Sequence, residues 1–351
     1  MTISTSSPEE KTATMKLKDF YFDLPEELIA QHPAQRREDA RLMVVHRETG
    51  RIEHAHVREL PWILPPSCLV FNDTRVRKSR LLATRRDSGG KVEILLLEEV
   101  EPSLWKAVVS RARRQRPGVV YELPGGREAE IVGMEEGLRL VRISPPIDEV
   151  YLDRHGHVPL PPYIKRSDLP EDEERYQTVF ARHPGSAAAP TAGLHFTPAL
   201  MDELKSRHTV TFLTLHVGLG TFQPVRTENV EEHRMHKERF YIPEETARVI
   251  EGAKSQHIPV CAVGTTTTRA LESAWEHGRL KRGWQETSLY IYPGYTFRVI
   301  DRLFTNFHTP GSSLVLLVSA FLGKDLLLEA YRKAIEHRYR FFSYGDAMLI
   351  I

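Results

Sequence analysis

The chain has little cysteine, no long apolar run and almost no net charge. Only Cys68 and Cys261 occur in 351 residues, which excludes a disulfide scaffold or a cysteine-rich zinc site and is typical of a reducing compartment. The longest apolar run, Leu314 to Leu322, is far shorter than the roughly 20 residues that cross a bilayer. The formal net charge is +1, so any nucleic-acid site must arise from local clusters of charge. We therefore expect a soluble, cytoplasmic protein.

The N-terminus lacks the apolar core of a secretory signal. Residues 1–14 are polar and rich in serine and threonine, so we expect a disordered tail, and Met15 is a possible functional start.

Two patterns divide the rest of the chain. From about Val76 to Pro146, short strands alternate with glycine, proline and charged turns, which is typical of a small antiparallel barrel. From Pro159 onward, strands alternate with helices, which favours an α/β layer domain. We predict a mixed-sheet α/β domain made of residues 15–74 and 151–351, with a small antiparallel β-barrel domain inserted at residues 75–150.

Local patterns predict the individual elements. The expected strands are Leu42–His46, Leu69–Phe71, Val92–Leu97, Trp105–Val109, Val119–Leu123, Leu138–Ile143, Val210–Val217, Val260–Val263 and Ser288–Ile291. The expected helices are Phe22–Ala30 with Asp23 as N-cap, Pro198–Arg207 capped by Thr197, Glu244–Ser255, Thr267–His277 and Lys324–His337.

Two stretches combine a histidine with small, proline and threonine residues: Gly185–Thr197 around His195, and Thr214–Pro224 around His216. Glycine and alanine let a backbone approach a ligand closely, and histidine suits proton transfer near neutral pH. The stretch Thr305–Ser313 has the same character around His308. We expect these stretches to line a ligand pocket.

A strand, a glycine and four threonines precede a helix in Val260–Ser273. Amides at such a helix start bind a carboxylate or phosphate, although one threonine could simply cap the helix. The pattern is not a P-loop, since no Gly-Lys-Thr/Ser follows. Gly218-Leu-Gly220 begins a dinucleotide fingerprint, but Gln223 stands where the third glycine belongs, which argues against nicotinamide binding.

Three further clusters allow more than one interpretation. His233, His236 and Glu238 could bind a metal, but their spacing is not that of zinc hydrolases, so a proton-transfer role or a solvated charge run remains open. The aromatic residues of Tyr290–Phe297 fit either core packing or a surface for a planar base or cation. Basic residues around the insertion could follow a phosphate backbone or cover a solvated barrel.

Nine motifs, in order from Phe71 to Ile350, resemble those of the S-adenosylmethionine:tRNA ribosyltransferase-isomerase family, and the resemblance covers nearly all the chain from about Phe20 to the end. They are Phe71–Arg75, Pro159–Ile164, Arg175–Val179, Gly185–Thr197, Thr214–Pro224, Gly264–Ser273, Ile291–Tyr295, Thr305–His308 and Phe341–Ile350. The four threonines at 265–268 differ slightly from the family's Gly-Thr-Thr-Ser/Thr-x-Arg pattern but keep its hydroxyls.

The resemblance implies a large α/β domain with a smaller barrel and a specific reaction. S-adenosylmethionine serves as a consumed ribosyl donor, and no other cofactor is expected. Its ribosyl part moves to the aminomethyl group of a 7-deazaguanine at the tRNA wobble position and rearranges to epoxyqueuosine, while adenine and methionine leave. The partners would be S-adenosylmethionine and the precursor tRNA, and we expect a monomer.

The resemblance also implies site residues. His195, His216 and His308 are the candidate catalytic acid and base. Substrate contacts are expected from Arg75, Arg175, Tyr176, Ser186, Thr191, Gly218, Gly220, Thr221, Gln223, Thr265, Thr266, Thr267, Arg269, Tyr292, Tyr295, Asn306 and Asp346. Contacts with the tRNA backbone are expected from Arg77, Lys78, Arg80, Arg111, Arg113 and Arg114.

Two alternatives belong to other classes. A non-catalytic RNA-binding protein would explain the basic clusters but not the histidine stretches. A metal-dependent hydrolase would use His233, His236 and Glu238, and no metal is expected under the enzyme interpretation.

Overall fold

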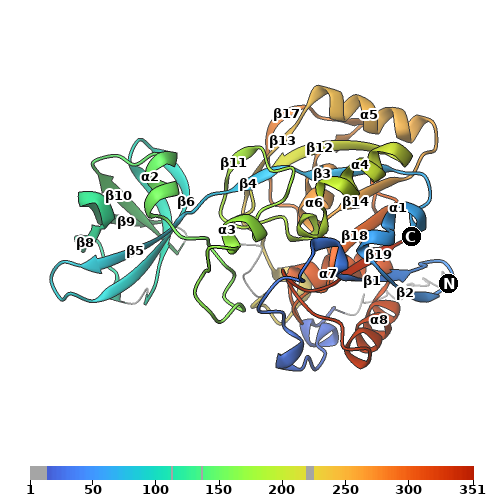
Figure 1. Cartoon of the computed structure of the whole chain (residues 1–351), viewed down its shortest axis with the longest axis horizontal. Coiled ribbons are helices and arrows are strands. Elements are labelled where there is room, and N and C mark those ends of the chain that lie inside the picture. The colour runs from blue at the N-terminus through green and yellow to red at the C-terminus, as the bar shows by residue number, and fades with distance from the viewer. Residues whose placement is uncertain (1–13, 112–113, 136, 219–224) are drawn as a thin grey trace, which may run out of the picture.

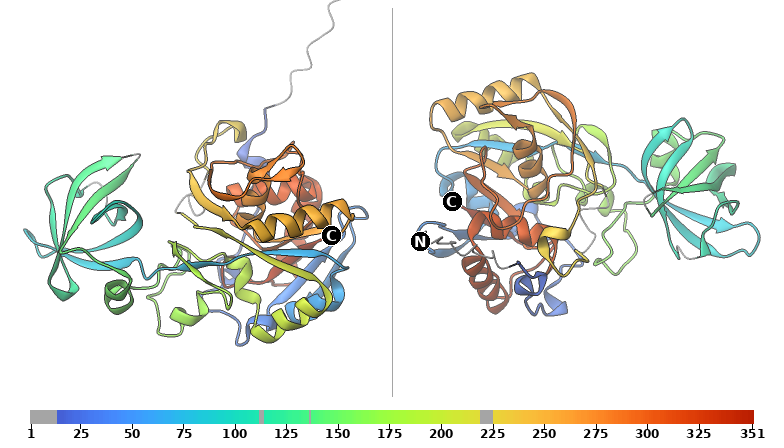
Figure 2. Two further views of the ribbon diagram at one scale, coloured as in Figure 1. Left: turned by 90° about the horizontal axis from the view of Figure 1, so that it is seen from above. Right: turned by 180° about the vertical axis from the view of Figure 1, so that it is seen from behind.

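The computed structural model describes residues 14–111, 114–135, 137–218 and 225–351. It contains a large α/β domain and a smaller β-barrel that lie side by side (Figures 1 and 2). The expected tail lies outside the described residues, apart from its last position.

A nine-stranded mixed sheet forms the centre of the α/β domain. Parallel pairs join β12 to β3, β3 to β14, β14 to β18 and β19 to β1, so six strands belong to parallel pairs. Antiparallel strands lie at both edges of the sheet, and β18 pairs antiparallel with β19. In order across the sheet the strands are β17 (Gly283–Thr287), β13 (Glu238–Ile242), β12 (Thr209–Leu215), β3 (Cys68–Asn72), β14 (Val260–Val263), β18 (Arg302–Asn306), β19 (Ala347–Ile350), β1 (Arg41–Val45) and β2 (Ile52–His56).

Alternating side chains give the sheet two apolar faces, as the two-residue period of a strand requires. In β3, for example, Cys68 and Val70 join one core while Leu69 and Phe71 join the other. Residues of α5 (Glu244–Ser255), α6 (Thr265–Ala274), α7 (Ser313–Leu322) and α8 (Lys324–Glu336) pack in the first core. Residues of α1 (Leu60–Ile63) and α4 (Pro198–Arg207) pack in the second.

The barrel closes in the order β10, β7, β6, β5, β8 and β9. Its interior is apolar, and Tyr151 and Leu152 of α2 (Glu149–His155) belong to the same core. The domain limits drawn at residues 75 and 150 stay a prediction. The strands are β5 (Arg80–Arg85), β6 (Lys91–Glu101), β7 (Leu104–Val109), β8 (Val120–Leu123), β9 (Arg127–Glu135) and β10 (Leu138–Ser144).

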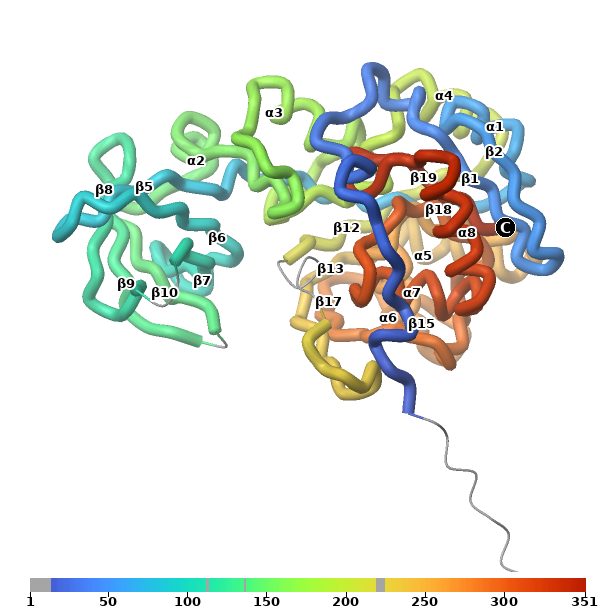
Figure 3. The backbone as a smooth tube through the Cα atoms, turned by 90° about the horizontal axis from the view of Figure 1, so that it is seen from below, coloured from blue at the N-terminus to red at the C-terminus, as the bar shows by residue number. Residues whose placement is uncertain are grey.

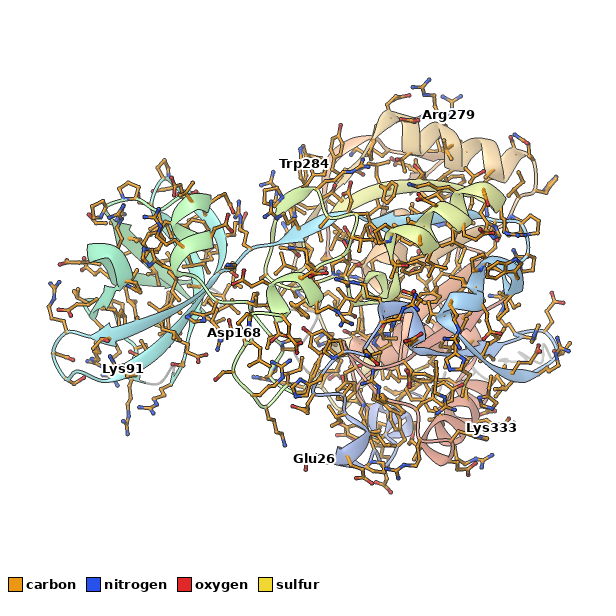
Figure 4. The ribbon with its side chains drawn as sticks, viewed as in Figure 1. Glu26, Lys91, Asp168, Arg279, Trp284 and Lys333 are labelled. Atoms are coloured by element: carbon orange, nitrogen blue, oxygen red, sulfur yellow. The ribbon has the colours of Figure 1, made fainter. Side chains whose placement is uncertain are left out.

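Short elements connect the two lobes. The parallel strands β4 (Thr74–Val76) and β11 (His183–Ser186) lie between them, near α3 (Asp172–Arg175) (Figure 1). Asp168, which Figure 4 places at this junction, pairs with Arg80 at the start of the barrel at 2.6 Å.

The remaining elements are the hairpin β15 (Trp275–Glu276) and β16 (Arg279–Leu280) and the 3-10 turns η1 (Leu17–Phe20), η2 (Glu26–Leu28), η3 (Arg37–Asp39), η4 (Val57–Glu59), η6 (Pro124–Gly126), η7 (Thr191–His195) and η9 (Val230–Glu232).

The mixed-sheet fold with an antiparallel barrel is confirmed, and so are the helices α4, α5 and α8 to within one residue. Thr197 caps α4 by accepting from the Leu200 amide at 3.2 Å. The expected helix at 22–30 is wrong: only the turn η2 forms, because Ile29 pairs instead with Phe341 as a β-bridge.

One expected strand is misplaced, and several elements of the α/β domain were missed. The strand expected at 288–291 is wrong, since β17 ends at Thr287 and the Leu289 carbonyl accepts from Arg269 at 3.1 Å. Strands β13, β18 and β19 were not predicted. The apolar run 314–322, considered only as a membrane segment, forms the buried helix α7.

Candidate functional site

A pocket lies at the carboxyl edge of the central strands. Strands β12 and β14 pair in parallel with β3, and β14 pairs in parallel with β18, so their carboxyl ends meet at one edge. Ligands of open α/β sheets bind at this edge. The lining residues are Tyr163, Ala189, Pro190, Thr191, Ala192, Val217, Gly264, Thr265, Thr266, Thr305, Asn306, His308, Thr309, Leu314, Phe342 and Ser343.

Two of the predicted histidine stretches meet beside this pocket. The Ala187 amide donates to the Val217 carbonyl at 3.1 Å, and the Val217 amide donates to Ser186 Oγ at 2.8 Å. Ser186 thus holds the two stretches together. The two stretches therefore lie against each other beside the pocket, although neither His195 nor His216 lines it.

The N-terminus of α6 faces the pocket through Gly264, Thr265 and Thr266. Gly264 has φ 97°, a conformation that glycine adopts easily and that turns the chain from β14 into the helix. Thr266 Oγ1 accepts from Asn72 Nδ2 at 3.2 Å, while the Thr267 hydroxyl donates back to the Val263 carbonyl at 2.8 Å. The free amides of a helix start favour an anion here, and Thr267 supports the turn.

Asn306, at the end of β18, links the pocket to His195. Its amide nitrogen donates to the Phe342 carbonyl at 2.8 Å, and its Oδ1 lies 3.2 Å from His195 Nε2. Burial lowers the pKa of His195 to about 4. The buried Arg37 donates to the Leu194 carbonyl at 3.0 Å, which fixes the residue before His195. His195 therefore contacts a pocket residue without lining the pocket itself.

His308 is the predicted histidine that lines the pocket. Its Nε2 lies 2.8 Å from Thr305 Oγ1, and its backbone amide donates to the Tyr331 hydroxyl at 2.9 Å. Burial lowers the pKa of His308 to about 3, so its imidazole is neutral near pH 7. A neutral, oriented imidazole in a pocket can accept a proton or a hydrogen bond.

The His216 side chain does not line the pocket and contacts residues outside the pocket lining. Its Nδ1 is 2.8 Å from Thr74 Oγ1, and its ring lies 5.7 Å from that of Trp284. Burial, with smaller effects from Arg77 and Arg239, lowers the pKa of His216 to about 4. Gly185 has φ 144°, and a Cβ there would lie 2.9 Å from the His216 ring. The neighbouring residue Val217 lines the pocket instead.

Arg269, expected to hold a carboxylate, is buried in an ion pair with Glu238. Glu238 Oε1 also accepts from the Gly218 amide at 2.9 Å. The pair therefore connects α6, β13 and the end of the second histidine stretch. Glu238 was one of the three possible metal ligands, and no group of three or more such side chains gathers among the described residues.

Several other predicted substrate residues make contacts within the protein. Arg175 donates to the Ala34 carbonyl at 2.6 Å, and Asp346 accepts from the Arg41 and Arg340 backbone amides. Tyr295 donates to Glu272 at 3.2 Å, and the Tyr292 ring packs 4.9 Å from Tyr290. The buried Tyr176 belongs to a small apolar core, Arg75 is exposed, and Gly220, Thr221 and Gln223 lie outside the described residues.

Comparisons with known proteins agree over almost the whole chain. A family model described as queuosine biosynthesis protein matches residues 17–350. This chain belongs to the queuosine biosynthesis protein family.

Relatives of this family are similar to the chain at full length. An S-adenosylmethionine:tRNA ribosyltransferase-isomerase from Treponema denticola is 49% identical over 348 residues, covering 96% of this chain and 100% of that protein. One from Acetivibrio thermocellus is 48% identical over 344 residues, with the same coverage. A crystal structure of S-adenosylmethionine tRNA ribosyltransferase from Thermotoga maritima is 35% identical, has a TM-score of 0.55, and covers 95% of this chain and 100% of that one. The resemblance inferred from the motifs is thus confirmed.

Sequence reasoning missed several pocket residues of this queuosine family member. Tyr163, Thr305, Thr309, Phe342 and Ser343 line the pocket, yet none was proposed. All five lie inside stretches singled out as motifs or as a histidine-containing loop, and that membership was the available signal. The Tyr163 hydroxyl bonds Ser343 Oγ, and the two rings of Tyr163 and Phe342 lie 4.7 Å apart.

Phe342 also has an unusual backbone. Its φ is 71°, which is rare for a bulky residue and costs free energy unless the surroundings enforce it. The Phe342 amide donates to the Phe307 carbonyl at 3.0 Å, and the Phe342 carbonyl accepts from Asn306. These bonds hold the strained residue at the pocket wall.

Three of the six basic residues proposed for tRNA are paired with carboxylates. Arg77 pairs with Glu149 at 2.7 Å, Lys78 with Glu173 at 2.8 Å, and Arg80 with both Asp168 and Glu93. Arg111 and Arg114 are exposed, and Arg113 lies outside the described residues. In this family member, the basic cluster at the start of the barrel is thus largely neutralised in the fold.

None of the helices in the described ranges has both the length and the apolar character needed to cross a bilayer.

Proposed function

We propose that this protein is an S-adenosylmethionine:tRNA ribosyltransferase-isomerase. It transfers the ribosyl part of S-adenosylmethionine to 7-aminomethyl-7-deazaguanine at the tRNA wobble position and rearranges it to epoxyqueuosine, releasing adenine and methionine. The observation that carries this proposal is the full-length match: 49% identity over 96% of the chain to a relative with that name.

The pocket chemistry supports a consumed S-adenosylmethionine. The start of α6 offers amides and threonine hydroxyls to the methionine carboxylate. Tyr163 and Phe342 offer ring faces that attract a sulfonium or stack on adenine. This assigns the aromatic role to Tyr163 and Phe342 in place of Tyr292 and Tyr295, which do not line the pocket. No further cofactor is required by the reaction.

We assign the base to His308, because it is the candidate histidine that lines the pocket. It would take the proton beside the sulfonium, a position that the positive sulfur already acidifies. With a pKa of about 3, His308 is unprotonated at neutral pH, so it is free to accept a proton and holds none to donate to adenine. His195 acts as a positioning residue through Asn306.

The macromolecular partner is tRNA, whose wobble base must leave the anticodon stack to enter the pocket. We further propose that the protein acts as a monomer in the cytoplasm. Its two cysteines are free and buried, as in proteins of a reducing compartment. Sedimentation velocity of the full chain would test the monomer.

The activity is tested by incubating the protein with S-adenosylmethionine and tRNA that carries the 7-aminomethyl-7-deazaguanine base. Chromatography of the small molecules should show adenine and methionine in equal amounts, and mass spectrometry of the nucleosides should show epoxyqueuosine. The same tRNA with unmodified guanine is the control and should release neither product. Absence of adenine release with the precursor tRNA contradicts the proposal, and full activity in a chelator would also remove the metal-dependent alternative.

A further inference from the structure

One face of the sheet edge formed by β12, β13 and β17 carries aromatic rings. Its alternate residues Leu213, Leu215 and Phe240 enter the apolar core, so their neighbours point to the opposite face. There, Trp284 lies 5.3 Å from Tyr241 and 5.7 Å from His216, and is 53% exposed. We name Phe212, His216, Tyr241 and Trp284 the aromatic face.

Arginines flank the aromatic face. The Arg239 guanidinium lies 5.2 Å from the Trp284 ring, and that of Arg182 lies 5.3 Å from the Phe212 ring. Both arginines are exposed, and neither forms an ion pair with a carboxylate of the described part of the chain. Glu286 lies opposite Arg239 in the β13–β17 register and pairs with Lys237 at 3.6 Å. Trp284 is the exposed ring of this face, while Phe212, His216 and Tyr241 are half-buried. Trp284 and the two exposed arginines remain available to a ligand.

The aromatic face begins beside the pocket. Val217 lines the pocket, while the preceding residue His216 contacts Trp284. Strands β13 and β17 lie on the side of the α/β domain nearest the barrel in both Figure 1 and Figure 3. Figure 4 shows Trp284 at the surface on this side. A chain that inserts one base into the pocket would therefore lay its neighbouring nucleotides on this face.

We propose that the aromatic face binds the unpaired anticodon-loop nucleotides next to the wobble base. Bases stack on exposed aromatic rings of a sheet, and arginines beside them neutralise the phosphates. If a second copy of this chain docked through the same face, its arginines would lie against Arg182 and Arg239 and repel them. The phosphates of a tRNA backbone would instead neutralise both arginines. The inference rests on the proposed function, because it needs tRNA as the substrate.

The test compares Trp284→Ala with a matched control. Trp62 is 63% exposed and has Arg207 at 5.2 Å from its ring, but it lies in α1 on the side of the domain away from the barrel (Figure 1). Stacking of one base contributes about 1–3 kcal/mol, so Trp284→Ala should weaken binding of the precursor tRNA about 10-fold. Trp62→Ala should leave it within 2-fold. Calorimetric binding of S-adenosylmethionine should stay unchanged in both.

Two further variants separate stacking from a structural role. Trp284→Phe keeps a ring and should restore most of the affinity for tRNA. Arg182→Gln combined with Arg239→Gln should weaken binding and lower the slope of log affinity against log salt by about 2, since each lost phosphate contact lowers it by about 1. These variants test whether the aromatic face binds tRNA even if Trp284→Ala melts at a lower temperature.

The outcomes keep the inference and the proposed function apart. If the wild type releases no adenine with precursor tRNA, the proposed function fails and the inference fails with it. If the wild type is active and Trp284→Ala and the arginine variant both bind tRNA normally, only the inference is overturned. A wild-type dimer that Trp284→Ala converts to a monomer, with tRNA affinity unchanged, would assign the face to a second copy instead.

Discussion

The two lobes differ in what they bury. The barrel core is apolar apart from the buried Gln115 and Arg139. Several basic residues at its base and surface pair with carboxylates such as Glu149, Asp168 and Glu128. The α/β domain buries polar side chains at one edge of its sheet, among them His195, Asn306 and His308. Burial of polar groups costs free energy unless they are bonded. The difference indicates that the chemistry is concentrated at the sheet edge, while the barrel's charges mainly serve its own structure.

The largest effect is expected at the pocket. His308→Gln should reduce turnover by at least about 100-fold, because general acid–base groups contribute about 10²–10⁴-fold. His216→Gln should cost much less, since His216 lies outside the pocket lining. Single-turnover adenine release measures both. Equal rates of adenine release for His308→Gln and the wild type would contradict the assignment of His308 as the base.

The next effect concerns stability. Arg269→Met leaves Glu238 buried without its ion-pair partner, which should lower the free energy of unfolding by about 3–5 kcal/mol. On the barrel, Arg86→Met breaks pairs with Glu122 and Glu128 whose side chains are about half exposed, so the loss should stay below about 1 kcal/mol. Urea unfolding of the two variants measures the contrast. Similar losses of unfolding free energy in the two variants would show that the ion pairs of the two lobes contribute equally to stability.

A smaller effect should appear with pH. Burial lowers the pKa of His308 to about 3 from an ordinary 6.5, so the unfolded chain binds more protons than the folded one between these values. The free energy of unfolding should therefore fall as the pH drops from about 6.5 toward 4. Comparing pH 7 with pH 5 by urea unfolding, His308→Gln should lose less stability than the wild type. An identical loss would mean that His308 is not the group that resists protonation.

The smallest expected contrast compares arginines of the two lobes. Arg80 already pairs with Asp168 and Glu93, so Arg80→Gln should change tRNA affinity by less than 2-fold. Arg239→Gln removes a cation that has no carboxylate partner among the described residues and should weaken binding several-fold. Filter binding at two salt concentrations distinguishes them. A larger loss of tRNA affinity in Arg80→Gln than in Arg239→Gln would assign tRNA binding to the base of the barrel.

Much of the fold was predictable because its signals are local. Thr197 and Pro198 predicted the start of α4 through capping chemistry, and the amphipathic pattern predicted α8. The strand β19 was missed because its few apolar residues resemble any short buried segment, and its parallel pairing with β1 spans most of the chain. The strand β13 was missed because Glu238 looked like the end of a solvated charge run, whereas Arg269 neutralises it inside the core.

The sequence alone determined the family, the two-lobe architecture and the stretches around the pocket, because long ordered motifs and local periodicity do not depend on distant contacts. Only the tertiary structure decided which side chains of those stretches reach the pocket. His308 lines it, while His216, one residue before a pocket residue, points to the opposite side of the chain. Alternation along an extended backbone and the pairing of charges across the fold set these directions, and neither is readable from residue types alone.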